Sequence, residues 1–130
     1  MLLRLGLFLC GCVLCVFVAL CASADDKEAK PPEFKADVLP IFEAKCLRCH
    51  GAQRRGGKLD MRSMEALLTG GVSGPALKKG NSKKSLLIEL IHFNEMPPKK
   101  ETPRVTREEL DLLRKWIDAM PAPEGSPREI

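Results

Sequence analysis

The stretch Cys46-Leu47-Arg48-Cys49-His50-Gly51 decides how this chain folds. A C-x-x-C-H motif is typical of covalent attachment of a c-type haem. Cysteines three positions apart lie on the same side of a helical turn, so both thiols can form thioethers with the vinyl groups of one porphyrin. His50 follows directly, and its imidazole can reach the iron as an axial ligand. We therefore expect one covalent haem c, with its iron, held by Cys46, Cys49 and His50. The Nδ1–H of His50 then needs an acceptor, usually a backbone carbonyl.

Three other interpretations of the two cysteines compete with haem attachment. A thioredoxin-like dithiol lies near a βαβ pattern, and this chain shows no predicted strands rich in β-branched residues. A tetrahedral zinc site needs four ligands, and His92 is the only further candidate beside Cys46, Cys49 and His50. A disulfide between Cys46 and Cys49 is the remaining alternative, as the product of failed haem attachment.

Residues 1–24 predict export. Twenty of these 24 residues are apolar, Arg4 lies in a short basic start, and Ala22-Ser23-Ala24 is a cleavage-site pattern ahead of charged residues. We expect a signal peptide over 1–24 and a periplasmic or otherwise exported protein. Because residues 5–24 are uncharged and about twenty such residues can span a bilayer, an uncleaved membrane anchor is the alternative. Four of the six cysteines lie in this leader, which leaves Cys46 and Cys49.

Length and composition favour one small domain. The 130 residues carry a formal charge of +4. The composition excludes collagen, a coiled coil, a polytopic membrane protein and a wholly disordered chain. The mild charge, without interleaved aromatic residues, argues against nucleic-acid binding. We expect a flexible lead-in over 25–33, a domain over 34–122 and a loose tail over 123–130.

Apolar residues at helical spacing predict short helices joined by glycine-rich loops. The expected helical segments are 34–47 with a kink or a second turn at Pro40, a short helix begun by Ser63 and ended by Gly70, a helix over 83–91 capped by Asn81 or Ser82, and a helix over 107–119 opened by the capping box Thr106-Arg107-Glu108-Glu109. The apolar faces of the last two are Leu86, Leu87, Leu90 and Ile91, and Leu110, Leu113, Trp116 and Ile117. The prediction is an all-α fold of short helices and loops wrapped around one covalent haem.

Met96 is the preferred sixth ligand of the iron. It precedes Pro97 and Pro98, which forbid a helix and stiffen the segment, so a thioether there can be held at one point. The separation of 46 positions between His50 and Met96 leaves room for the chain to reach the opposite face of the haem. His92 is the alternative sixth ligand. The other methionines have different expected roles: Met61 lies in an extended connector, and packing explains Met64 and Met120.

Residues 34–122 resemble a planctomycete-type cytochrome c domain of the class I cytochrome c superfamily. The resemblance is carried by an ordered set of motifs: Val38-Leu39-Pro40-Ile41-Phe42, C-x-x-C-H-G, Gly56-Gly57-Lys58-Leu59-Asp60, Leu67-Leu68-Thr69-Gly70-Gly71, Ser73-Gly74-Pro75-Ala76, Lys83-Lys84-Ser85-Leu86-Leu87, Met96-Pro97-Pro98 and Leu113-Arg114-Lys115-Trp116-Ile117-Asp118. It implies a single-domain class I cytochrome c-like fold, haem bound through Cys46 and Cys49, and His50 and Met96 as axial ligands. The segment before Met96 is short for the family, and Met120-Pro121-Ala122-Pro123 replaces a glycine-containing helix exit.

The expected function is electron transfer rather than enzymatic catalysis. A His/Met-ligated iron keeps both ligands as it changes oxidation state. Redox proteins, acidic or membrane-bound, are the expected partners, and no small-molecule substrate is inferred. A basic surface that could dock them comprises Lys78, Lys79, Lys83, Lys84, Lys99 and Lys100, with Arg54 and Arg55. The alternatives are a haem sensor or peroxidase-like catalyst with a labile sixth ligand, and a docking module of a larger redox complex.

Overall fold

The computed structural model describes residues 30–125, which form helices and no strand. This confirms the all-α prediction for that part of the chain. The predicted signal peptide over 1–24, most of the lead-in over 25–33 and the end of the tail over 123–130 lie outside the described residues. Within 30–125, no helix is both long and apolar enough to cross a bilayer.

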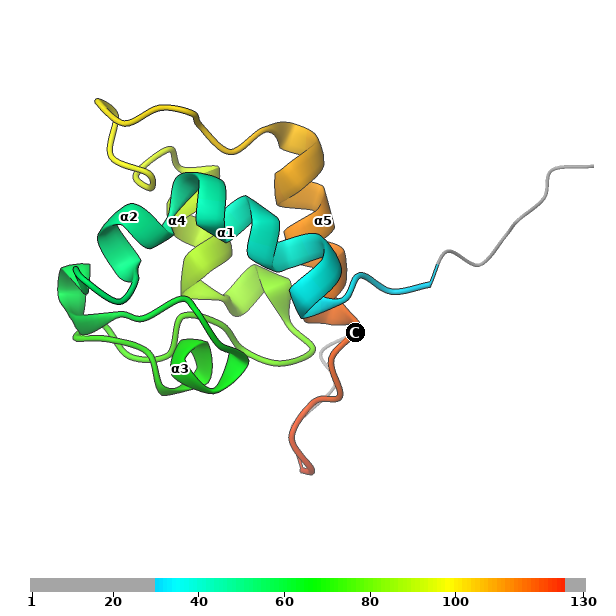
Figure 1. The fold of residues 1–130 in the computed structure, drawn as a ribbon. Coiled ribbons are helices and arrows are strands. Elements are labelled where there is room, and N and C mark those ends of the chain that lie inside the picture. Colours follow the sequence, from blue (N-terminus) through cyan, green and yellow to red (C-terminus); the bar gives the residue numbers. More distant parts are fainter. Residues whose placement is uncertain (1–29, 126–130) are drawn as a thin grey trace, which may run out of the picture. The chain divides into compact units, whose positions relative to one another are not determined.

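The chain enters the domain through three consecutive helical segments (Figure 1). A π-helical turn, η1 (Phe34–Val38), leads into α1 (Leu39–Lys45), and α2 (Leu47–His50) follows. Pro40 lies in the first turn of α1. Proline is tolerated there because the first amides of a helix have no intrahelical acceptor. At the expected break near Pro40, the π-helical turn η1 changes into the α-helix α1.

Two short elements and a glycine-rich loop form the next part of the chain. The first is the 3₁₀ turn η2 (Gly56–Lys58), and the second is α3 (Met64–Thr69). As predicted, Ser63 caps α3, since its Oγ accepts a hydrogen bond from the Ala66 N–H at 3.2 Å. Gly70 ends α3 with φ 76°, a conformation that favours glycine.

The expected continuous helix over 83–91 is wrong in its extent. The structure has a 3₁₀ turn, η3 (Ser82–Lys84), and a separate helix α4 (Leu86–His92), with Ser85 extended between them. Asn81 caps η3 by accepting from the Lys84 N–H at 3.0 Å. Ser85 is buried; its Oγ accepts from the Lys78 N–H at 2.9 Å and donates to the Asn81 carbonyl at 2.8 Å. These local hydrogen bonds compete with the helix and interrupt it.

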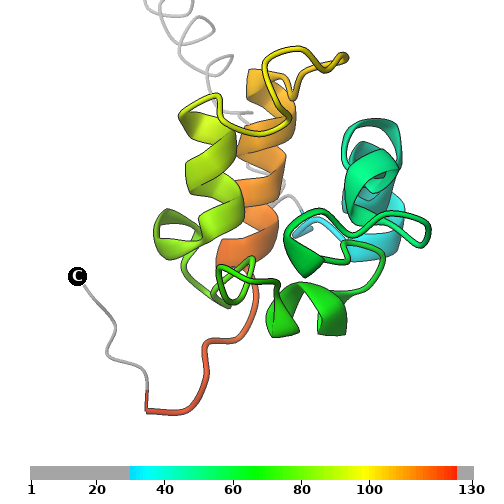
Figure 2. The same ribbon diagram turned by 90° about the vertical axis from the view of Figure 1, so that its left-hand side faces the viewer.

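Helix α5 (Arg107–Asp118) closes the domain, and its predicted capping box is confirmed. Figure 2 shows α4 and α5 side by side with opposite chain directions. Leu113, Trp116 and Ile117 face the core, as predicted. Trp116 stacks on Phe34 at 5.8 Å between ring centroids and meets Phe42 edge-on at 6.3 Å. This aromatic cluster joins the first helical segments to the last helix.

Candidate functional site

The attachment motif forms one tight turn. The Cys46 carbonyl accepts hydrogen bonds from the Cys49 N–H at 3.0 Å and the His50 N–H at 2.9 Å. The two cysteines and the histidine therefore belong to a single helical turn. Gly51 ends it in an extended conformation, and a Cβ there would lie 2.3 Å from the Leu47 carbonyl oxygen. The last residue of the C-x-x-C-H-G motif must thus lack a side chain.

A mostly apolar cavity of about 400 Å³ opens beside this turn. That volume is within the range of cofactor sites. Its walls come from the end of α1 and α2, the connector after α2 (residues 51–63), the glycine-rich loop after α3 (residues 70–76), α4 and the segment after α4. The residues that line it include Lys45, Cys46, Cys49, His50, Leu59, Met61, Leu86, Leu87, Leu90, Ile91 and Met96.

The apolar face of α4 predicted from the sequence is confirmed as a wall of this cavity. Leu86, Leu87, Leu90 and Ile91 all line it. Ile88, which that prediction omitted, is buried in the protein core instead. Helix α4 therefore contacts both the core and the cavity.

The ring of His50 lies against Gly56. Its Nδ1 is buried and has no hydrogen-bond partner within residues 30–125, so the expected backbone acceptor is not found there. Gly56 packs against the ring: a Cβ on Gly56 would lie 3.4 Å from His50 Cε1 and 3.7 Å from Nδ1. The His50 carbonyl accepts from the Met61 N–H at 2.8 Å. An imidazole fixed in this way at the wall of an apolar cavity, on the same turn as two thiols, fits a haem iron ligand.

The two thiols are free. Burial raises the pKa of the Cys46 thiol to about 12, although the ammonium of Lys45 acts in the opposite direction. A redox-active dithiol needs a readily formed thiolate, so this environment disfavours the thioredoxin-like interpretation. Within the described part of the chain, no group of three or more His, Cys, Asp or Glu side chains is arranged to hold a metal ion directly.

Met96 lies half-buried at the cavity wall, in the loop over 93–106 that joins α4 to α5, here called the Met96 loop. The N–H groups of Glu95 and Met96 both donate to the Leu90 carbonyl, at 2.8 and 3.0 Å. Asn94 makes the necessary reversal with φ 64°, a conformation that asparagine tolerates better than most residues. The backbone at Met96 is thus attached to the last turn of α4.

His92 occupies a different environment. It is exposed at the end of α4, is not among the described residues that line the cavity, and its Nδ1 lies 3.4 Å from Arg114 Nη2. Met61 is 98% buried and does line the cavity. Its amide, however, is bonded to the carbonyl of His50 itself.

A backbone contact between two glycine segments, not anticipated from the sequence, closes part of the cavity. Val72 N–H donates to the Gly57 carbonyl at 2.8 Å. A Cβ on Gly71 would lie 2.3 Å from the Gly57 carbonyl oxygen, and one on Gly70 would lie 1.9 Å from that of Gly74. The paired glycines in the sequence were the available signal for so close an approach.

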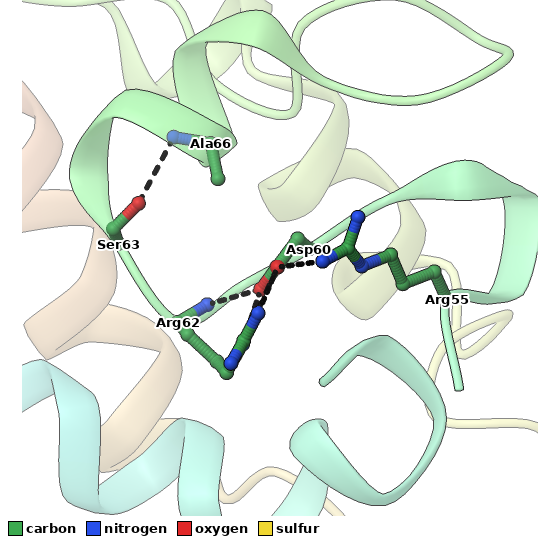
Figure 3. Close-up of polar contacts among 5 residues, drawn as sticks. All are labelled: Arg55, Asp60, Arg62, Ser63 and Ala66. Carbon is green, nitrogen blue, oxygen red and sulfur yellow. Dashed lines mark hydrogen bonds and ion pairs between the residues drawn. The ribbon is translucent and has the colours of Figure 1, made fainter. Parts of the chain in front are cut away.

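Asp60 fixes the connector that carries Leu59 and Met61. Figure 3 shows its carboxylate between the guanidinium groups of Arg62 and Arg55. Arg62 Nη2 donates to Asp60 Oδ2 at 2.7 Å and Arg62 Nε to Oδ1 at 3.0 Å. These hydrogen bonds lower the pKa of Asp60 to about 2.

A second polar group that sequence reasoning missed joins α1 to the Met96 loop. Lys45 Nζ donates to the Arg104 carbonyl at 2.8 Å and forms an ion pair with Glu109. Burial alone would raise the pKa of Glu109, but the hydrogen bonds from Lys45 and from the Thr106 N–H outweigh it and lower that pKa. One turn further on, Arg48 of α2 forms an ion pair with Glu101 of the same loop.

The six lysines predicted as a docking surface are not among the residues that line the cavity in the described structure. Five are exposed and Lys79 is half-buried. Four lie in and before η3, and Lys99 and Lys100 lie in the Met96 loop. The basic residues that line the cavity are Lys45, Arg48 and Arg54.

Part of the chain is similar to a known protein family. Residues 46–100 match the family model described as Planctomycete cytochrome C, which confirms the resemblance over those residues. This segment runs from Cys46 through the Met96-Pro97-Pro98 motif. No curated protein and no solved structure gives a significant match.

Proposed function

Since residues 46–100 carry the planctomycete cytochrome C signature, we propose that this protein is an exported monohaem cytochrome c that carries single electrons between redox proteins. The observation that carries the proposal is the cavity that brings Cys46, Cys49, His50 and Met96 to its walls. The family match supports haem binding and electron transfer in general terms. Attachment, ligation and location are our proposals.

The chain supplies the residues that such a cofactor needs. The thiols of Cys46 and Cys49 would tether the ring, and His50 would bind the iron from the same turn. Leu86, Leu90 and the other apolar side chains of α4 that line the cavity would exclude water from the ring. Haem supplies an iron that gains or loses one electron. An apolar wall and two retained ligands would keep the rearrangement between oxidation states small.

We assign the sixth ligand to Met96. It lines the cavity and lies on a loop with defined main-chain hydrogen bonds. Exposed His92 would have to turn inward from the end of α4. Met61 is hydrogen-bonded through its backbone to the His50 carbonyl, whereas Met96 lies on a separate loop and would supply a ligand independent of the attachment turn. A sensor or peroxidase-like function would require Met96 to leave the iron.

Location and partners follow from the rest of the chain. The apolar leader over 1–24 with its cleavage-site pattern would direct the domain out of the cytoplasm. Arg48 and Arg54 line the cavity, and Lys99 and Lys100 are exposed on the Met96 loop; these basic side chains would attract acidic partners. Electron transfer to an acidic partner should then slow as ionic strength rises.

The test is production of the exported protein in a host with a cytochrome maturation system. We expect a coloured polypeptide whose mass exceeds that of the mature apoprotein by one haem, and a ferric spectrum with the weak near-infrared band of methionine ligation. The variant Met96→Ala should lose this band and bind carbon monoxide rapidly in the ferrous state, while His92→Ala should keep the wild-type spectrum. A colourless protein at apoprotein mass contradicts haem attachment. Rapid, stoichiometric carbon monoxide binding by the wild type favours the sensor or catalyst.

A further inference from the structure

The Met96 loop carries a cluster of hydrogen bonds centred on one side chain, Arg104. Arg104 Nη1 donates to the carbonyls of Pro97 and Pro98, the latter at 3.0 Å. Arg104 Nη2 donates to the carbonyl of Asn94 at 3.2 Å and to its Oδ1. The residues that Arg104 holds therefore lie on both sides of Met96.

This loop needs such a partner. Pro97 and Pro98 have no N–H groups, so this part of the loop cannot donate main-chain hydrogen bonds. A planar guanidinium has five donors in a fixed arrangement and can serve several acceptors at once. Hydrogen bonds from a charged donor are also stronger than those between neutral groups. One side chain thus replaces the secondary structure that the loop lacks.

The backbone of Arg104 is fixed by the last residue of α1. Its carbonyl accepts the hydrogen bond from Lys45, the residue immediately before Cys46. A continuous polar connection therefore runs from the attachment turn, through Arg104, to the segment that carries Met96. One end of this connection adjoins the turn that carries His50, and the other is the segment that carries Met96, the two proposed iron ligands.

We propose that Arg104 is the positioning residue for Met96, holding the loop in the conformation that presents the thioether to the cavity. The inference rests on the proposed His50/Met96 ligation. When the guanidinium is removed, the loop should populate conformations in which the sulfur is away from the iron. An added ligand then competes with a smaller fraction of bound methionine, so its apparent affinity rises.

The experiment compares the haem-loaded proteins Arg104→Ala, Arg104→Lys and Arg107→Ala with the wild type. Arg107, exposed at the start of α5, is the matched control. We expect Arg104→Ala to weaken the near-infrared methionine band and to raise the apparent affinity for imidazole at least tenfold. Arg104→Lys should lie between, because an ammonium cannot span the same acceptors. Arg107→Ala should stay within twofold of the wild type.

A second variant and a second measurement keep the test decisive if Arg104→Ala does not fold. Asn94→Gly retains the positive φ and removes only the Oδ1 acceptor, and we expect a two- to fivefold rise in imidazole affinity. Amide hydrogen exchange at Glu95 and Met96 should accelerate in both variants.

The outcomes separate this proposal from the proposed function. If the wild type shows the band while Arg104→Ala and Asn94→Gly match it in band intensity and imidazole affinity, the role of Arg104 is refuted and the ligation stands. If the wild type lacks the band and Met96→Ala leaves its spectrum unchanged, the ligation itself is refuted, and the positioning role with it.

Discussion

Replacing Lys45 by methionine tests the connection between the attachment turn and α5. The Lys45 side chain is 8% exposed and that of Glu109 is 26% exposed, so the ion pair is partly shielded from water. Lys45→Met keeps the apolar stem and removes both the ion pair and the hydrogen bond to the Arg104 carbonyl.

The expected loss of stability follows from these contacts. Removing one partner of a fully buried ion pair costs about 3–5 kcal/mol. Glu109 retains the hydrogen bond from the Thr106 N–H and some contact with water, which reduces the penalty. The Arg104 carbonyl, in contrast, loses a charged donor worth about 1.5–3 kcal/mol. We expect Lys45→Met to lower the free energy of unfolding by about 2–3 kcal/mol at pH 7.

Urea unfolding of the haem-loaded protein measures this loss, followed by the fluorescence of the single tryptophan, Trp116, and by far-UV circular dichroism. Lys115→Met, an exposed control on α5, should change stability by less than about 0.5 kcal/mol. In a cycle with Glu109→Gln, the two substitutions should be non-additive by about 1 kcal/mol or more.

The pH dependence gives a second check. The pKa of Glu109 is lowered in the folded protein, so its contribution is present above the unfolded pKa and is lost as pH falls through the folded pKa. The stability difference between wild type and Lys45→Met should therefore shrink below about pH 4. A cost under about 0.5 kcal/mol at pH 7, or a difference that is the same at pH 3, would refute the reasoning.

Three further predictions concern the core, the attachment turn and the connector. Leu113 is fully buried, so Leu113→Ala should destabilise the protein by about 2–4 kcal/mol in urea unfolding; a loss under about 1 kcal/mol contradicts the packing described. Gly51→Ala places a Cβ against the Leu47 carbonyl, and we expect a smaller haem-bearing fraction by mass spectrometry. Wild-type haem content and stability in that variant would show that the turn can shift freely. Asp60→Asn should cost about 1 kcal/mol at pH 7, a modest value because water screens the exposed arginines. Since the pKa of Asp60 is lowered to about 2, this difference should shrink as pH falls from about 4 through 2; a difference at pH 2 as large as that at pH 7 contradicts the assigned ion pairs.

The features that could be predicted from sequence depend on residues close together in the chain. The attachment turn spans five positions. The caps at Ser63 and Thr106 each involve a residue three positions on. Such contacts follow from helical geometry alone. The apolar face of α5 could be predicted equally well, because helical spacing determines which side chains share a face.

The features that were missed depend on distant residues or on competition between local alternatives. The Lys45 ammonium reaches a carbonyl 59 positions away and a carboxylate 64 positions away. Nothing near Lys45 in the sequence distinguishes it from the solvent-exposed lysines. The acceptors of the Arg104 side chain are close to it in the sequence, but its role depends on the turn that Asn94 makes at positive φ. The apolar spacing around Ser85 predicted a continuous helix, yet the hydrogen bonds of the Ser85 side chain interrupt that helix.

The attachment turn is local, whereas the wall that carries Met96 is assembled from the second half of the domain. Chain segments that lie close in sequence meet early in folding, and distant ones meet late because loop closure costs entropy. The turn at Cys46–His50 can thus form while α4 and α5 are still unstructured. A haem linked at that stage would serve as an apolar nucleus on which Leu86, Leu90 and Ile91 collapse, and methionine coordination would mark the end of maturation.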